Sequence, residues 1–166
     1  VSDDGHLDIA GGVVVNTAGF RIHPGREVDL FAGGTIRQSA GSLRVNGTLD
    51  VASSPSLELL GGMLEGTGVI VIGDLSNTAS TIDPGTFPVG DPALSVGTLT
   101  IDGDATFATL GPPAAARLRA ELTESMGNDL LVVTGTANLG GVLEVVHDPL
   151  PEGSSFTVLD ADALTG

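Results

Sequence analysis

The repeating unit of this chain is clearest in one short stretch, LRVNGTLDV at residues 43–51. Two apolar–polar–apolar triplets, residues 43–45 and 49–51, are separated by Asn46 and Gly47. Apolar residues two positions apart lie on one face of a strand. Gly and Asn accept the backbone conformations that tight turns require. The stretch therefore predicts two short strands joined at a corner.

Similar alternating runs recur along the chain and are followed by Gly, Asn or Asp. They are Leu7-Asp8-Ile9, Val28-Asp29-Leu30, Leu57-Glu58-Leu59, Val69-Ile70-Val71-Ile72, Leu99-Thr100-Ile101 and Leu131-Val132-Val133. In the middle of the chain the runs start about 14 residues apart, and this period is too short for helical repeats. We predict an all-β fold, a right-handed parallel β-helix (β-solenoid). The alternative is an antiparallel β-sandwich, in which Asn-Gly would close hairpins.

Two stretches depart from this pattern. Residues 76–96 contain Pro84, Pro88 and Pro92 and predict an irregular bridge within a single module spanning residues 1–166. Residues 114–126 fit a helix by one spacing and a strand by another.

The composition predicts a core of stacked aliphatic side chains. The 166 residues include 25 Gly and five Phe but no Trp, Tyr or Cys. The length is sufficient for a core without disulfides or zinc–thiolate sites. The predicted core residues are Leu43, Val45, Leu49, Val51, Leu57, Leu59, Val69, Val71, Leu99, Ile101, Val132, Leu143 and Val145.

The charge excludes several classes of partner. Six basic residues, all Arg, face 21 acidic ones, which gives a formal net charge of −15. Nucleic-acid binding requires a basic surface, so no nucleic-acid partner is expected. No apolar run approaches the ~20 residues needed to span a bilayer, so no direct membrane insertion by this segment is expected. The acidic exterior would keep an elongated module soluble.

The second half of the chain contains an ordered series of motifs that resembles the end of autotransporter-like passenger regions of large secreted bacterial proteins. The motifs are IDPG at 82–85, GTLTIDGD at 97–104, NDLLVVTGTANLGGVLEV at 128–145 and FTVL at 156–159. The resemblance implies a right-handed parallel β-helix that ends in a cap, exported to the bacterial cell surface or beyond. It also favours a strand at residues 117–123. One departure is the insertion of residues 86–96 between the first two motifs, and the family pattern leads us to expect a fragment of a longer chain.

The candidate metal ligands are Asp102 and Asp104, which flank Gly103. Two carboxylates at a corner could contribute to a calcium site, but Ca²⁺ takes six to eight oxygen ligands. The sequence lacks the EF-hand and the nonapeptide Gly-Asp signatures. A solvated turn is therefore the favoured interpretation, and no cofactor is required.

No catalytic residue is predicted. Glycosidases need two carboxylates at a set separation, and the outward Asp29, Asp50, Glu58 and Glu144 could supply them. However, sugars usually stack on aromatic faces, and the chain has no Trp or Tyr. We therefore expect a non-enzymatic structural module of a secreted or cell-surface protein, of the adhesin or stalk type.

Two alternative functions remain open. The first is a self-assembling extracellular fibre or sheath subunit, in which the chain is its own partner end to end. Open solenoid ends expose unpaired backbone groups that could pair with a second copy. The second alternative is a carbohydrate-binding or polysaccharide-cleaving β-helix, whose partner would be a cell-surface or matrix polysaccharide.

Overall fold

The chain is all-β in its computed structural model, which describes residues 6–31, 33–51, 57–85, 96–108, 115–123 and 127–166. None of these residues is helical, and none therefore belongs to a helix that could cross a membrane. The strands are β1 (His6–Ala10), β2 (Val13–Asn16), β3 (Gly19–Ile22), β4 (Glu27–Phe31), β5 (Thr35–Gln38), β6 (Ser42–Val45), β7 (Thr48–Asp50), β8 (Leu57–Leu59), β9 (Met63–Gly66), β10 (Val69–Asn77), β11 (Thr81–Pro84), β12 (Thr98–Phe107), β13 (Arg117–Thr123), β14 (Gly127–Asn128), β15 (Leu130–Asn138), β16 (Val142–His147) and β17 (Leu159–Thr165).

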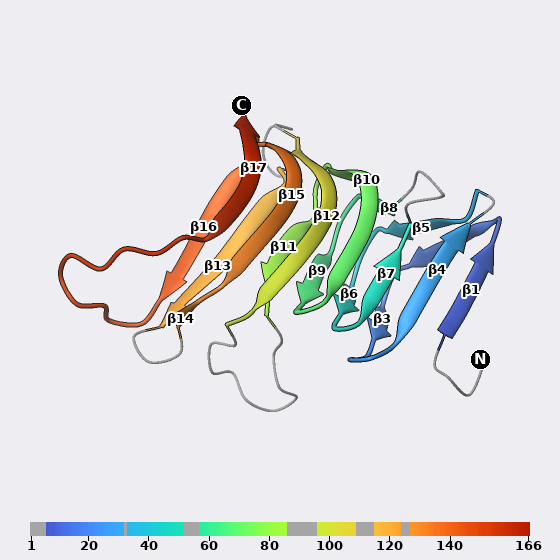
Figure 1. Cartoon of the computed structure of the whole chain (residues 1–166), viewed down its shortest axis with the longest axis horizontal. Helices are drawn as coiled ribbons and strands as arrows, with labels where there is room; N and C mark the ends of the chain where they lie inside the picture. Colours follow the sequence, from blue (N-terminus) through green and yellow to red (C-terminus); the bar gives the residue numbers. More distant parts are fainter. Residues whose placement is uncertain (1–5, 32, 52–56, 86–95, 109–114, 124–126) are drawn as a thin grey trace.

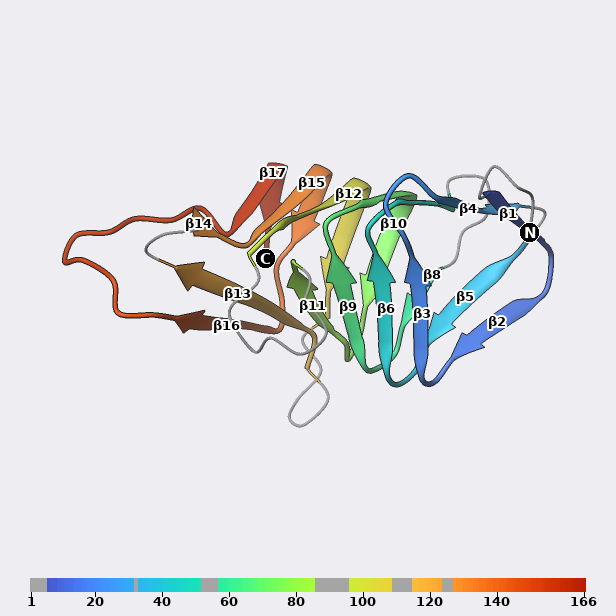
Figure 2. The ribbon, with the colours of Figure 1, turned by 90° about the horizontal axis from the view of Figure 1, so that it is seen from below.

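The strands form two sheets. The larger sheet has the order β1-β4-β7-β10-β12-β15-β17, with β2, β5 and β8 attached beside it, and its strands cross the molecule in one row (Figure 1). The smaller sheet joins β3, β6, β9, β11, β13 and β16, and β14 pairs with β13 (Figure 2). Every strand pair in the described part of the chain is parallel except β13–β14. The antiparallel β-sandwich alternative is therefore wrong.

The pairing follows a 21-residue repeat rather than the predicted repeat of about 14. Leu7, Val28, Leu49 and Ile70 are register partners in four successive strands and lie 21 residues apart. The same row of register partners continues through Ile101, Val133 and Ala161. The shorter spacing arose because consecutive runs belong to different sheets. The run at 28–30 lies in β4 of the larger sheet, whereas the run at 43–45 lies in β6 of the smaller one.

Most of the predicted core is confirmed. The buried members are Leu43, Val45, Leu49, Val51, Leu57, Leu59, Leu99 and Ile101. They pack in one aliphatic cluster with inward residues of neighbouring strands, such as Leu30, Ile36 and Leu64.

Three core predictions are wrong because the phase of a continuous apolar run was misassigned. Val69 is 36% exposed and Val71 is half-buried, whereas Ile70 and Ile72 are buried. Ile70 is in register with buried Leu49, so this row fixes the inward face of β10. The same shift applies in β15, where Val132 is half-buried and its neighbours at 131 and 133 are buried.

Two further core predictions, Leu143 and Val145, fail for a different reason. Leu143 is 55% exposed and Val145 is 44% exposed. Leu143 is in register with buried Leu118, so it continues an inward row. The only described strand that pairs with β16 is β13, so no further strand covers the outer edge of β16.

The predicted irregular bridge is wrong where the structure describes it. β10 continues to Asn77, and β11 covers Thr81–Pro84. The remainder of the bridge includes residues 86–95, which lie outside the described residues.

The ambiguous segment at residues 114–126 is a strand where it is described. Arg117–Thr123 forms β13, which pairs in parallel with β11 and β16. The helical interpretation is therefore wrong for these residues, and the strand that the resemblance favoured is confirmed. Residues 109–114 and 124–126 lie outside the described residues.

Close contact between successive turns of the chain requires glycine at defined positions. Gly103 has a φ of +149°, and a Cβ there would lie 1.7 Å from the carbonyl oxygen of Ile72. At Gly66, φ is +132° and a Cβ would lie 2.0 Å from the carbonyl oxygen of Val45. Only glycine avoids both the steric overlap and the strained backbone at these positions.

Candidate functional site

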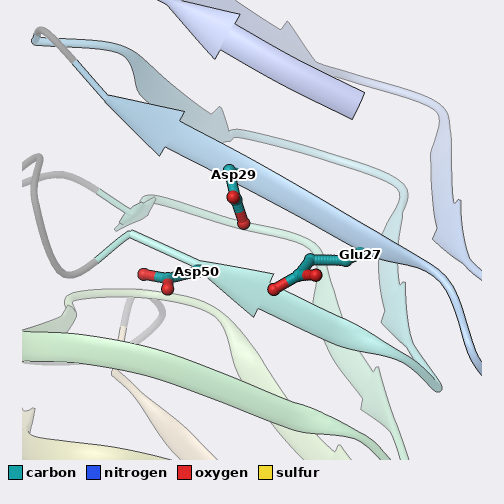
Figure 3. Close-up of side chains that lie close together, drawn as sticks. All are labelled: Glu27, Asp29 and Asp50. Atoms are coloured by element: carbon teal, nitrogen blue, oxygen red, sulfur yellow. The ribbon is translucent and has the colours of Figure 1, made fainter. Parts of the chain in front are cut away.

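Three carboxylates converge on the outer face of the larger sheet. Glu27 and Asp29 belong to β4, and Asp50 belongs to the neighbouring β7 (Figure 3). One carboxylate oxygen from each residue lies within 4.8 Å of the others. Glu27 is exposed, and Asp29 and Asp50 are half-buried.

The strand alternation and the register create this cluster. Glu27 and Asp29 flank buried Val28, so both side chains point away from the core. Asp29 and Asp50 are register partners because they occupy the same position in successive 21-residue repeats. The signal was present in the sequence, since Asp8 also occupies this position. The expected period of about 14 residues concealed it.

The cluster offers oxygen ligands only, and a hard cation such as Ca²⁺ prefers such ligands. Three carboxylates would supply part of a shell of six to eight oxygens, so water would have to complete it. Groups of exposed acidic side chains are also common without a bound ion. The cluster is therefore a donor set compatible with calcium and carries no further assignment.

The predicted ligands Asp102 and Asp104 lie on β12, away from this cluster in the sheet, and both are exposed. Asp102 Oδ1 accepts a hydrogen bond of 2.7 Å from the hydroxyl of Thr134. Asp104 Oδ1 accepts a hydrogen bond of 2.6 Å from the backbone N–H of Thr136. Each carboxylate thus links β12 to β15. A calcium site at these two residues stays a prediction.

A second group of charged side chains lies on the smaller sheet and is largely buried. We call it the ion network, and it comprises Arg44, Glu65, Asp83, Arg119 and Glu121. Arg44 and Glu65 form an ion pair at 3.0 Å, and Arg119 contacts Asp83 at 2.9 Å and Glu121 at 2.5 Å. The side chains of all three acids are at most 5% exposed. Charges at this depth must be paired, because burial without a partner is costly.

Asp129 joins the ion network to two other segments. Its side chain is fully buried, and its oxygens accept hydrogen bonds of 2.8 Å from the backbone N–H groups of Gly97 and Glu121. The sequence predicts a local turn cap at Asn128 and Asp129. The carboxylate of Asp129 instead ties together the segments that begin β12, lie within β13 and begin β15.

Burial perturbs two acids in this region. Desolvation raises the pKa of Asp83 to about 6, although the neighbouring Arg119 opposes the increase. Desolvation also raises the pKa of Asp129 to about 7, and its two backbone hydrogen bonds oppose the increase. Perturbed acids occur at catalytic sites and also in structural ion networks. Here each acid holds a strand or an arginine in place.

The sequence could not reveal that the ion network is buried. Alternation places Arg44 and Glu65 on the face opposite to the apolar core residues, where exposure is the usual expectation. Their burial depends on tertiary structure. Comparison with known proteins adds no functional assignment, because no family model, no curated protein and no solved structure matches this chain.

Proposed function

We propose that the chain is a right-handed parallel β-helix and serves as a non-enzymatic structural module of a secreted or cell-surface bacterial protein, of the adhesin or stalk type. The observation that carries the proposal is the row of register partners that begins Leu7, Val28, Leu49 and Ile70. A spacer built from equivalent coils requires such a row. The right hand follows from the strong preference of parallel β crossovers.

The core supports a load-bearing role. Neighbouring parallel strands lie about 4.8 Å apart, so every coil adds a fixed increment of length. Inward aliphatic residues of successive coils contact one another in a continuous cluster, as Leu49, Ile70 and Ile101 do in one row. In such repeat architectures stability arises mainly between neighbouring units, so length can change without loss of the fold.

The outer surface supports an extracellular spacer. Outward positions along one row of the larger sheet include Asp8, Asp29, Asp50 and Asp102. This acidic row and the net charge of −15 favour solubility of an extended module. The resemblance to autotransporter-like passenger regions supports display at the bacterial surface.

The proposed absence of catalysis is supported by the roles of the perturbed acids. Asp83 is held by Arg119, and Asp129 is held by two backbone N–H groups. A general acid or base must reach the reacting atom of a substrate. These two carboxylates are instead directed at strands of the chain itself.

Deletion of one coil tests the proposal. A variant lacking residues 48–68 removes 21 residues and brings Ile70 into register with Val28. We expect it to fold cooperatively, with parallel-sheet circular dichroism and a shorter hydrodynamic dimension. The matched control lacks residues 48–61, which removes 14 residues and places strands of the smaller sheet in positions of the larger one. We expect this control to unfold.

A duplication guards against a deletion that merely destabilises the chain. A variant in which residues 48–68 occur twice adds a coil, and we expect it to melt at least as high as the parent chain. Failure of both the duplication and the 21-residue deletion to fold would contradict the proposed spacer. A thermal shift with neutral or acidic polysaccharides would also contradict it and favour the carbohydrate-binding alternative.

A further inference from the structure

Exposed apolar side chains gather at the C-terminal end of the described structure. The large apolar residues of the last coil that are at least 40% exposed are Leu139, Val142, Leu143, Val145 and Leu164. A hollow of about 710 Å³ opens beside them. Its lining includes Phe107, Leu118, Leu143, Phe156, Leu159 and Leu164. An apolar concentration of this kind on a surface marks an interaction site.

The strand that borders this hollow is the last of its sheet. β16 pairs with β13, and no other described strand pairs with it. At the opposite end of the same sheet, β3 pairs with β6 alone among the described strands. Free strand edges pair readily with a strand from another chain. The two ends of the smaller sheet thus provide two edges whose strands run parallel to each other.

The residues on the two edges are complementary. If the parallel register continues from β16 to β3 of a second copy, Phe20 lies over Leu143, Arg21 over Glu144 and Ile22 over Val145. The order apolar, basic, apolar on β3 then meets the order apolar, acidic, apolar on β16.

The same arrangement already occurs inside the chain. Leu43 and Arg44 of β6 lie in register with Leu64 and Glu65 of β9, and the two charged side chains form an ion pair at 3.0 Å. Within its own chain, Arg21 has another arginine, Arg44, as its register partner. Contact with Glu144 of a second copy would replace like charges in register with opposite charges, which favours one register.

We propose that the C-terminal end of this chain, comprising β16 and the apolar hollow, binds the N-terminal end of a second copy through β3. Phe20 enters the hollow beside Leu143, and Arg21 pairs with Glu144. The contact joins unlike ends, so it repeats from copy to copy and produces an open filament. This inference rests on the proposed β-helix and adds a specific partner to it.

Sedimentation velocity of the 166-residue chain over increasing concentration tests the inference. We expect the sedimentation coefficient to rise as end-to-end association proceeds. Leu143→Lys places a charge in the contact and should weaken association at least about tenfold, which corresponds to about 1.4 kcal/mol. The matched control is Val69→Lys, which makes the same kind of change at an exposed position of the larger sheet. We expect it to associate like the parent chain.

Charge exchange provides a test that does not depend on apolar substitutions. Glu144→Arg and Arg21→Glu should each weaken self-association, and an equimolar mixture of the two variants should restore it. Failure of the mixture to associate would overturn the assigned pair.

Two other outcomes would overturn the inference and leave the proposed β-helix intact. A parent chain that stays monomeric would mean that another protein or another segment covers the hollow. Association that neither Leu143→Lys nor Glu144→Arg weakens would place the contact elsewhere. The coil deletion described above reports separately on the β-helix.

Discussion

Replacement of Ile70 by Ala tests which side of β10 faces the core. Ile70 is fully buried, and its register partners Leu49 and Ile101 are fully buried on either side. The change removes three carbon atoms, worth about 2.4 kcal/mol at about 0.8 kcal/mol per buried methylene. Because Ile70 is packed between neighbours on two strands, a cavity penalty adds to this loss. We expect a total decrease in the free energy of unfolding of about 3–4 kcal/mol.

The adjacent Val71→Ala variant is the matched control. Val71 is half-buried and points outward between Asp50 and Asp102. We expect a loss below about 1 kcal/mol, as is usual for a surface substitution. Urea denaturation followed by far-ultraviolet circular dichroism measures both variants, and the urea dependence should be unchanged. An equal or greater loss for Val71→Ala would refute the assigned inward face.

Two further predictions concern pH and backbone packing. The pKa values of Asp83 and Asp129 in the folded state, about 6 and about 7, lie above the usual 3.8. The folded state therefore binds more protons than the unfolded state between about pH 4 and 7. The contribution of these acids to stability should fall as pH rises through this window, by a few kcal/mol in total at most. Urea midpoints from pH 4 to 8 measure the slope, which should decrease in Asp129→Asn; an unchanged slope would contradict the assignment. Separately, Gly103→Ala should cost at least about 2 kcal/mol because its Cβ would overlap the carbonyl oxygen of Ile72. Gly73→Ala, which meets no atom within 4 Å, should cost much less in the same urea assay; similar losses would contradict the close backbone contact.

Local alternation was sufficient to predict the all-β class and much of the core. The triplets that contain Leu43, Leu49 and Leu57 each hold one polar residue between two apolar ones, and this polar residue fixes the inward face. The run at residues 69–72 has four consecutive apolar residues and no such marker. Its phase was decided by pairing with β7, which local sequence does not report.

The 21-residue repeat and the candidate site depend on contacts between coils. Runs that follow one another in sequence alternate between the two sheets, so their spacing differs from the distance between stacked residues. The cluster of Glu27, Asp29 and Asp50 becomes visible only when the register is known. The ion network around Arg119 also escaped prediction, because alternation indicates direction from the core but does not determine the burial of an outward side chain.

The most direct test of the central claim is a series of distances between spin labels along one row of the larger sheet. Glu27, Thr100, Val132 and Asp160 occupy the same row, and all point outward. The chain has no cysteine, so introduced cysteines can be labelled specifically. Electron–electron resonance on labels at 27 and each of the other three positions measures the separations.

Stacked parallel coils predict that these separations increase in steps of about 4.8 Å, to about 14, 19 and 24 Å. The three values correspond to three, four and five strand spacings from Glu27. Equal separations, or a separation to Asp160 shorter than that to Thr100, would contradict the continuous parallel stack.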